Sequence, residues 1–462
     1  HFYSFIYCRY WYATQYYGPH DRPPIGKWIP LSFQHVFAMF GATVLVPLLT
    51  GLSTSTALFT AGTGTLLYIL ITGAKVPAFL GSSFAFIPAL IAIGQQYGPA
   101  YAMGGAIFAG IFYALIALII KLTGREWIDK ALPPVVIGSV IIVIGLGLAP
   151  TAIGEFFNHP ATGNYSLVCA CVAAVTLLIA IIATIFCKGF FNTLSILIGL
   201  IGGYIFALIM GAIFPNSDWH LINFQGVKDA PWFCIPFLHA DESLAATGFK
   251  WILPKFNLVA ILTFVIVSIS TVCEHMGDTL TTSKVVGQDF YKDPGLHRTL
   301  LGDGVATAWA AVWGGPPNTT YGENIGVMAI TKVYSVWVIG GAAVIAVLLS
   351  FCGKFGALIN TIPTPVLGGI CTLLYGLIAS SGLRTIVDAG VDYQDKRNLT
   401  ISSVILVLGI GGATLQFQIG SSFNFALGGV ALATVVGVIL NLVIPKTKPE
   451  AVEETKNAEI TE

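Results

Sequence analysis

Fourteen apolar segments follow one another along the chain, and no other feature constrains its fold as strongly. Of the 462 residues, 55% are apolar and only 10% are charged, whereas a soluble protein of this length carries about 25% charged residues. A helix needs about 20 mostly apolar residues to cross a bilayer. The sequence therefore predicts an all-α polytopic membrane protein. The predicted segments are 29–50, 54–73, 78–94, 99–121, 133–153, 165–187 and 190–214 in the first half, and 256–280, 296–313, 318–331, 334–353, 362–381, 398–414 and 423–444 in the second.

Two of these segments are short and interrupted, and they occupy the same place in each half of the chain. The third, 78–94, contains a Gly-Ser-Ser step at residues 81–83, and the tenth, 318–331, follows a Gly-Gly-Pro-Pro run at residues 314–317. Broken segments at matching positions of two halves indicate a transporter site between inverted repeats. Since each half has an odd number of segments, the second half must be inverted. Two re-entrant loops with only a structural role would give the same pattern.

The Lys and Arg residues predict the orientation of the chain. Basic residues gather on the cytoplasmic side of membrane proteins, and a cytoplasmic N-terminus places 18 of the 22 Lys and Arg residues on that side. We therefore expect a protein of the cell membrane, inner or plasma membrane, with both termini in the cytoplasm. Residues 1–28 form an aromatic tail to which we assign no function, residues 215–255 an extracellular connecting loop, and residues 446–462 a cytoplasmic tail.

Three carboxylates inside the predicted segments are candidate site residues, because an acid at membrane depth is costly unless it is paired or protonated. Glu323 follows the Gly-Gly-Pro-Pro run and the polar residues 318–321. Glu274 and Asp278 are four residues apart, so they share one helix face. Such a pair suits proton coupling and also hydrogen bonding to a neutral ligand. Asp278 could instead lie in water at the cytoplasmic end of its helix, near Lys284.

Three further residues are candidates for which an ordinary role stays open. Ser83 could offer its hydroxyl to a ligand or cap the chain locally. Phe84 could stack on a flat heteroaromatic ring or pack among apolar side chains. His35 could take part in proton coupling or form a helix-to-helix hydrogen bond. We assign Asp303 a structural role in the interior of the bundle.

Other kinds of chemistry find little support in the sequence. The net charge is zero, which argues against a nucleic-acid partner. The eight Cys residues are scattered, without a disulfide framework or a zinc-binding spacing. The chain has no H-E-x-x-H motif, so we expect no metal, no cofactor and no enzymatic activity.

Residues 323–332, ENIGVMAITK, resemble the signature of the nucleobase–ascorbate transporter family. That signature is an acid or amide, then Asn, any residue, Gly, four more residues, Thr and a basic residue. The motifs QHVFAMFGATVLVP, LGSSFAF, EHMGD, KDPGLHR and PPNTTYGENIGVMAIT are similar to those of its uracil-permease branch. The resemblance covers nearly all of residues 29–445.

The resemblance implies fourteen transmembrane segments in two inverted seven-segment repeats, with short antiparallel strands in segments three and ten. It divides the chain into a core domain, residues 29–122 (segments 1–4) and 256–353 (segments 8–11), and a gate domain, residues 123–214 (segments 5–7) and 354–445 (segments 12–14). It also implies a homodimer that forms through the gate domain within the lipid bilayer.

The resemblance also implies a substrate site. Glu274 and Glu323 are similar to the two carboxylates that hydrogen-bond the nucleobase in the family. The family's pocket is lined by residues that are similar to Phe84, Tyr321 and Gly322. His35 is similar to a histidine of the site network.

The implied activity is proton-coupled uptake of uracil or a related nucleobase by alternating access, in which the core moves against the gate. Some uracil permeases carry a histidine where this chain has Asp278. The proton could therefore rest on Asp278, or on Glu274 alone. Uptake of xanthine or another purine, and coupling to Na⁺ in place of a proton, are the alternatives.

Overall fold

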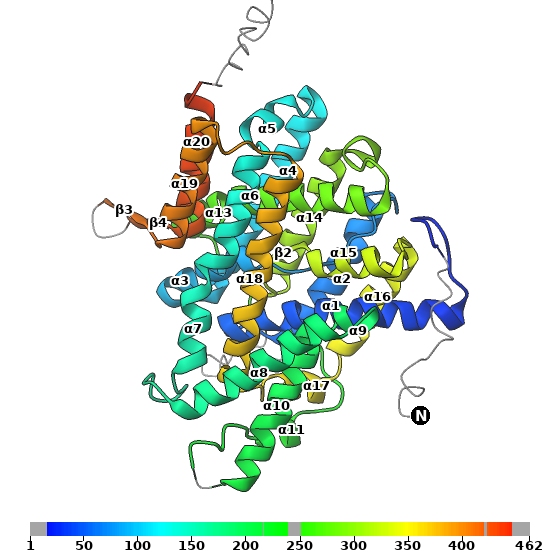
Figure 1. The fold of residues 1–462 in the computed structure, drawn as a ribbon, viewed down its shortest axis with the longest axis vertical. Helices are drawn as coiled ribbons and strands as arrows, with labels where there is room; N and C mark the ends of the chain where they lie inside the picture. Colours follow the sequence, from blue (N-terminus) through cyan, green and yellow to red (C-terminus); the bar gives the residue numbers. More distant parts are fainter. Residues whose placement is uncertain (1–15, 216, 239–250, 420–422, 446–462) are drawn as a thin grey trace, which may run out of the picture.

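The computed structural model describes residues 16–215, 217–238, 251–419 and 423–445, and most of these residues are helical (Figure 1). The predicted cytoplasmic tail and most of the predicted N-terminal tail lie outside the described residues. Within the described chain, eight helical segments are long and apolar enough to cross a membrane. They are α1 (Ile25–Thr50), α2 (Thr54–Ile71), α4 (Pro99–Thr123), α6 with α7 (Pro134–Gly147 and Ala149–Phe157), α8 (Leu167–Phe186), α10 (Ser195–Ile213), α13 (Leu258–Val286) and α18 (Thr364–Asp388).

Shorter helices lie between and around these spans. Those of 10 to 17 residues are α3 (Ile87–Tyr97), α14 (Leu296–Val312), α15 (Gly322–Thr331), α16 (Val336–Ser350), α19 (Lys396–Ile410) and α20 (Gly429–Val443). The shortest are η1 (Phe84–Phe86), α5 (Glu126–Ala131), α9 (Phe190–Thr193), α11 (Gln225–Asp229), η2 (Tyr291–Gly295) and α17 (Gly353–Ile359).

Two short strands meet at the centre of the bundle. β1 (Leu80–Ser82) and β2 (Asn318–Thr320) pair antiparallel, with Gly81 opposite Thr319. They lie within the two interrupted segments, where Pro and Gly residues prevent a continuous helix. Each strand leads directly into a helix, β1 into η1 and α3, and β2 into α15.

Side chains of neighbouring helices bond the backbone of these strands. Thr65 Oγ1, from α2, accepts a hydrogen bond from the Leu80 N–H at 2.9 Å. Thr307 Oγ1, from α14, donates to the Asn318 carbonyl at 2.8 Å. Because lipid cannot hydrogen-bond a free backbone, irregular backbone is stable at membrane depth only where protein groups or water surround it.

A β-hairpin lies between α19 and α20. β3 (Thr414–Ile419) and β4 (Phe423–Gly428) pair antiparallel. The sequence predicted strands only in segments three and ten and a helical segment from residue 423; the helical start of that segment is wrong, because residues 423–428 form β4 and α20 begins at Gly429. Gly412, with a φ of +66°, follows α19 and has a left-handed backbone that ends helices. Polar and apolar residues then alternate through residues 414–418, as in a strand.

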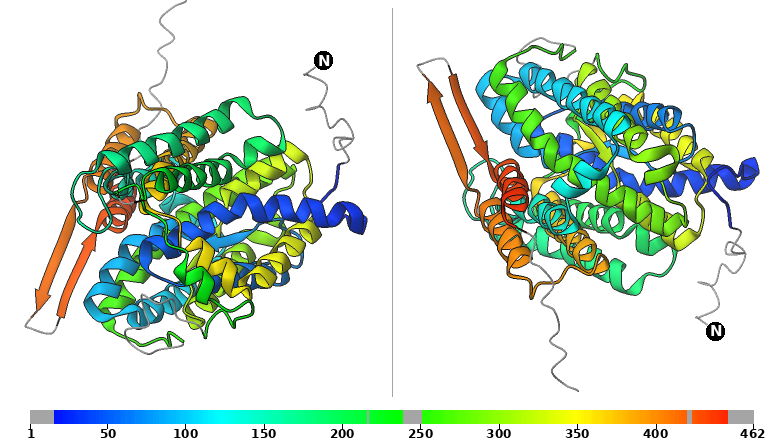
Figure 2. Two further views of the ribbon diagram at one scale, coloured as in Figure 1. Left: turned by 90° about the horizontal axis from the view of Figure 1, so that it is seen from below. Right: turned by 90° about the horizontal axis from the view of Figure 1, so that it is seen from above.

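The helices pack in two groups (Figures 1 and 2). In the first group α14 packs against α2 and α4, α16 against α1 and α2, and α13 against α4. In the second group α18 packs against α6, α7 and α8, while α19 and α20 pack against each other and against α6. The strands β1 and β2 contact α2, α13 and α14 of the first group, and α13 also contacts α6 and α20 of the second. α13 therefore lies at the boundary between the groups.

Glycines allow the helices of each group to approach closely. A Cβ added at Gly304 of α14 would lie 2.8 Å from the carbonyl oxygen of Gly110 in α4. A Cβ added at Gly382 of α18 would lie 2.5 Å from the carbonyl oxygen of Gly138 in α6. Small residues at such crossings let membrane helices pack backbone against backbone.

The predicted connecting loop packs against the bundle in its described part. The Cys234 N–H donates to the Phe351 carbonyl, at the end of α16, at 2.9 Å. The described residues before α1 also bind the first group, since the Val336 N–H donates to the Pro19 carbonyl at 2.9 Å.

Candidate functional site

The crossing of β1 and β2 brings two helix N-termini to the centre of the first group. The Ser83 N–H donates to the Pro317 carbonyl at 2.8 Å, and the Tyr321 N–H donates to the Phe79 carbonyl at 3.0 Å. η1 begins one residue after Ser83, and α15 begins one residue after Tyr321. The first N–H groups of a helix have no partner within the helix and carry partial positive charge, so they favour acceptor atoms of a ligand.

Two of the predicted carboxylates lie on α13 beside β2. Asp278 Oδ2 accepts a hydrogen bond from Thr320 Oγ1 at 2.8 Å. The Glu274 carboxyl lies beside the Thr319 side chain, and its buried Oε2 has no hydrogen-bond partner among the described residues. α13 continues to Val286, two turns beyond Asp278. Asp278 is therefore not at the end of its helix.

The third carboxylate enters from α15. Glu323 lies in the first turn of this helix, half-buried, and close enough to Glu274 and Asp278 to interact with both electrostatically. Gly322 is exposed, and a Cβ added there would have no atom within 4 Å. The structure thus brings the three carboxylates together from two elements, next to open space at the start of α15.

The Tyr321 ring packs over β1, and its hydroxyl is hydrogen-bonded to that strand. Its hydroxyl donates to the Ser82 carbonyl at 3.1 Å and accepts from Thr43 Oγ1 at 3.2 Å. A Cβ added at Gly81 would lie 2.5 Å from the Tyr321 ring. The Tyr321 hydroxyl is therefore already bonded, as is its backbone N–H, so the ring is the part of this residue that is available to a ligand.

Ser83 and Phe84 form the other side of the crossing. Phe84 is 5% exposed, and its ring meets the edge of the Tyr375 ring from α18 at a centroid distance of 5.8 Å. This contact joins the first group of helices to the second. The Ser83 hydroxyl is buried and has no hydrogen-bond partner among the described residues, so a ligand could bond it without breaking an existing contact.

His35 lies behind α15 and contacts Asn324. The Asn324 side-chain nitrogen lies 3.0 Å from His35 Nδ1 and donates to the His35 carbonyl at 3.1 Å. Both side chains are buried. His35 of α1 therefore contacts Asn324 of α15, the residue after Glu323. A hydrogen bond between helices was one of the two roles expected for His35.

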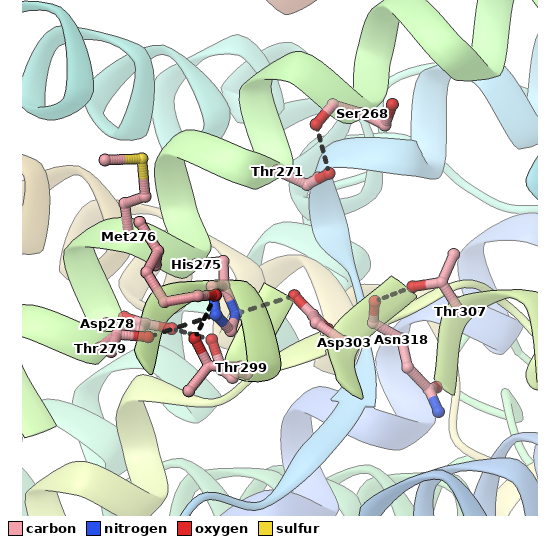
Figure 3. A network of polar contacts seen from close by, with 12 residues as sticks. Ser268, Thr271, His275, Met276, Asp278, Thr279, Thr299, Asp303, Thr307 and Asn318 are labelled. Atoms are coloured by element: carbon pink, nitrogen blue, oxygen red, sulfur yellow. Dashed lines mark hydrogen bonds and ion pairs between the residues drawn. The ribbon is translucent and has the colours of Figure 1, made fainter. Parts of the chain in front are cut away.

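A buried pair that the sequence did not predict lies on the other side of α13. His275 Nδ1 lies 3.0 Å from Asp303 Oδ2 of α14, and both side chains are fully buried (Figure 3). His275 Nε2 lies 3.3 Å from Thr279 Oγ1. The sequence predicts only a structural role for Asp303 and none for His275. An unpaired polar group would be costly here, and each of the two side chains gives the other a close polar partner. The adjacent polar residues of the E-H-x-x-D motif, inside an apolar segment, are the signal that could have indicated it.

A cavity of about 610 Å³ opens between the two groups, at the end of the molecule where α5 lies. Arg125, Asp129 and Ile137 lie on one wall, and Met276 and Lys284 of α13 on the other. Burial raises the pKa of Asp129, and the Arg125 guanidinium, 3.5 Å away, opposes that rise. Since Met276 lies between Glu274 and Asp278 in sequence, the cavity reaches the helix that carries both carboxylates.

Gly277 marks the close contact between α13 and α6 beside this cavity. A Cβ added at Gly277 would lie 3.0 Å from Ile141 Cδ1 and 3.6 Å from Ile137 Cγ2. Near the open end, Lys284 Nζ lies 3.7 Å from Asp388 Oδ2 of α18. These contacts join the two groups of helices on one side of the carboxylates. Within the described residues, no group of three or more His, Cys, Asp or Glu side chains could hold a metal ion.

Comparison with known proteins gives a family match over most of the chain. The sequence profile described as "Permease family" matches residues 26–418. The chain is 50% identical over 446 residues to a uracil permease of Bacillus subtilis, covering 96% of this chain and 98% of that protein. It is 51% identical over 438 residues to a uracil permease of Bacillus caldolyticus, covering 94% and 95%. It is 41% identical over 451 residues to a uracil permease of Escherichia coli, covering 96% and 98%.

The fold is similar to that of solved transporter structures. The transmembrane domain of a cyanobacterium bicarbonate transporter, BicA, matches with a TM-score of 0.59 and 14% identity, over 93% of this chain and 100% of that chain. SLC26A9 matches with a TM-score of 0.62 and 11% identity, over 90% of this chain and 64% of that chain. At these identities the similarity concerns the fold alone.

Proposed function

The chain belongs to the nucleobase–ascorbate transporter family of permeases and is a multi-pass membrane transporter rather than an enzyme, and from this premise we propose that it takes up uracil together with a proton. One observation carries the proposal. Glu274 of α13 and Glu323 of α15 are near enough to interact electrostatically, beside the paired strands β1 and β2, where the helices that follow these strands begin. The names of the relatives at 41–51% identity support uracil as the substrate.

Uracil fits the chemistry of this crossing. Its ring presents N–H donors flanked by carbonyl acceptors. Ionised carboxylates only accept hydrogen bonds, so Glu274 and Glu323 suit the N–H groups. The backbone N–H groups at the starts of η1 and α15, and the free Ser83 hydroxyl, suit the carbonyls. The Phe84 ring offers an apolar face to the flat pyrimidine, and Gly322 leaves room for it to approach.

The proton is carried near the same carboxylates. Glu274 and Asp278 share one face of α13, with Glu323 close by. Three ionised carboxylates this close repel one another, so proton uptake by Glu274 or Asp278 relieves the repulsion and favours closure around the substrate. His35 belongs to this network only through Asn324 and α15.

The architecture we propose is the fourteen-segment inverted repeat, in which the first group of helices is the core domain and the second the gate domain. The separate packing of the two groups supports this division, and so does the cavity between them. Alternating access then consists of the core moving against the gate, with the cavity as the path to the cytoplasm. In this proposal the protein lies in the cell membrane as a homodimer, with both termini in the cytoplasm.

Radiolabelled uracil uptake into proteoliposomes tests the proposal. With an inward proton gradient, we expect uracil to accumulate above its external concentration, and a protonophore to abolish the accumulation. A sodium gradient alone should not drive uptake, and excess xanthine should not compete. Uracil uptake that needs sodium would contradict the proton, and xanthine uptake in place of uracil would contradict the substrate. Absence of uptake of either base under both gradients would contradict the proposed function as a whole.

A further inference from the structure

Glu155 is a carboxyl inside a membrane-spanning segment, and the proposed function gives it no role. It lies in the last turn of α7, near the end of the span that α6 and α7 form. Its Oε2 atom is buried and has no hydrogen-bond partner among the described residues. Acids are rare in membrane spans, and where they occur they usually take part in a function. Glu155 is therefore a candidate for proton chemistry outside the candidate substrate site.

Among the described residues, no basic side chain pairs with Glu155. α7 packs against α6, α8 and α18, and α6, α7 and α8 contain no Lys, Arg or His. The one basic residue of α18 is Arg384, which lies about 24 Å along the helix from Gly368, where an added Cβ would lie 2.7 Å from the backbone carbonyl carbon of Glu155. His159 follows α7, and its Nδ1 accepts from the Ala161 N–H at 3.3 Å within its own turn. Within the described chain, no cation therefore compensates a charge on this carboxyl.

The surroundings of Glu155 favour the neutral, protonated carboxyl. An unpaired carboxylate is costly in an apolar interior, and the C-terminal end of a helix carries partial negative charge, which disfavours a negative side chain in its last turn. The titratable side chains of α18 that interact with Glu155 electrostatically are Cys371 and Tyr375, one turn apart. Asp388 lies at the far end of α18, and the titratable side chains of α8 are two cysteines. A neutral carboxyl, unlike a carboxylate, has a proton to give.

Tyr375 lies near both Glu155 and the substrate site. Its ring meets the edge of the Phe84 ring at a centroid distance of 5.8 Å, and Phe84 begins η1 beside the paired strands. The Tyr375 hydroxyl is buried and, like Glu155 Oε2, has no hydrogen-bond partner among the described residues. A phenol hydroxyl is both a donor and an acceptor. It can therefore accept a proton from one group while it gives its own proton to another.

Glu155 and the cavity lie at opposite ends of one span. The α6–α7 span begins beside α5, where the cavity opens, and runs from there toward the other end of the molecule (Figure 1). Pro134, the first residue of the span, lines the cavity, whereas Glu155 lies in the last turn. In the proposed function, on which the role of Glu155 rests, the cavity is the path to the cytoplasm. Glu155 therefore lies toward the outer side, from which the proton enters.

We propose that Glu155 collects the proton on the outer side and passes it to the carboxylates of the substrate site through the Tyr375 hydroxyl. The neutral Glu155 carboxyl donates its proton to Tyr375 Oη, and Tyr375 gives its own proton onward, through water, to the carboxylate of Glu274 or Asp278. Glu155, left ionised, then takes a proton from hydronium at the outer side and releases water. The net result is one proton moved from outer water to the site, with Glu155 and Tyr375 unchanged.

Two modes of transport separate this role from a structural one. Accumulation of radiolabelled uracil under an inward proton gradient needs net proton entry, whereas exchange of external for internal uracil without a gradient needs none. We expect Glu155→Gln and Tyr375→Phe each to lower the initial rate of gradient-driven uptake at least about tenfold, because a positioned proton-transfer group usually contributes more than that to a rate. Exchange in the same proteoliposomes should be nearly unchanged.

Glu126→Gln, at an exposed position of α5, is the matched control and should keep both modes of transport. Full gradient-driven accumulation by either variant would overturn the proposed role. Loss of exchange together with accumulation would also overturn it, since such a loss indicates damage to the fold or to substrate binding. An unchanged protein that does not accumulate uracil under a proton gradient would contradict the proposed function itself, and this role with it.

The pH profile of uptake decides the question if Glu155→Gln does not fold. Glu155→Asp keeps the carboxyl but withdraws it by one methylene group, which changes its surroundings. The external pH of half-maximal uptake should therefore shift, whereas Glu126→Asp should leave it in place. An unshifted profile in Glu155→Asp would overturn the proposed role.

Discussion

Replacing Glu274 with Gln should lower uracil uptake at low substrate concentration by about 100-fold. A hydrogen bond to a charged group contributes up to about 3 kcal/mol, which corresponds to about two decades in affinity. Glutamine has nearly the same shape, but it exposes an NH₂ group where the uracil N–H needs an acceptor. The Glu274 Oε2 atom makes no hydrogen bond to the described residues, so the substitution removes little from the fold. Initial rates of radiolabelled uracil uptake in proteoliposomes measure the effect.

Glu126→Gln is the matched control for this substitution. Glu126 lies at an exposed position of α5, away from β1 and β2. Its replacement by Gln is the same chemical change. Its uptake should equal that of the unchanged protein. A Glu274→Gln protein that takes up uracil within about threefold of the unchanged protein, less than 1 kcal/mol, would show that this carboxylate does not bind the substrate.

Replacing Gly81 with Ala should have the second large effect, through the backbone of the site. The new Cβ would lie 2.5 Å from the Tyr321 ring, so the ring or the strand must move. Such overpacking costs about 1–3 kcal/mol, and movement of the ring breaks the hydrogen bond from the Tyr321 hydroxyl to the Ser82 carbonyl. Since the starts of η1 and α15 are positioned by this crossing, we expect uracil uptake to fall at least about tenfold, for about 1.4 kcal/mol of lost binding.

Gly94→Ala provides the control in the same segment. Gly94 lies in α3, and a Cβ added there would meet no atom within 4 Å. Uptake should be unchanged, and the melting temperature should equal or slightly exceed that of the unchanged protein, because Ala favours helix over Gly. Equal uptake by the Gly81→Ala and Gly94→Ala proteins would mean that the crossing does not shape the substrate site.

The sequence predicted the two interrupted segments and the shared helix face of two carboxylates, because those predictions depended on local chemistry. Pro and Gly residues interrupt two short segments, and β1 and β2 lie in those interruptions. Glu274 and Asp278 share a helix face by their spacing alone, and both face β2 in the structure. Their role in binding uracil stays a prediction, as do the roles of Glu323 and Phe84.

Features that depend on contacts between distant elements could not be predicted in the same way. The His275–Asp303 pair joins α13 to α14, and no spacing within either helix indicates which partner each side chain meets. The bonded hydroxyl of Tyr321 likewise follows from its packing on β1. The hairpin was not predicted for another reason: residues 423–428 continue directly into an apolar run and were predicted as the start of a membrane helix, while residues 415–422 fell between two predicted segments.

A structure determined with uracil bound tests the central claim most directly. It should show the uracil ring between Glu274 and Glu323, with at least one N–H within about 2.7–3.2 Å of a carboxylate oxygen, and its face beside Phe84. Uracil bound elsewhere, for example in the cavity lined by Arg125 and Lys284 with neither carboxylate in contact, would contradict the account.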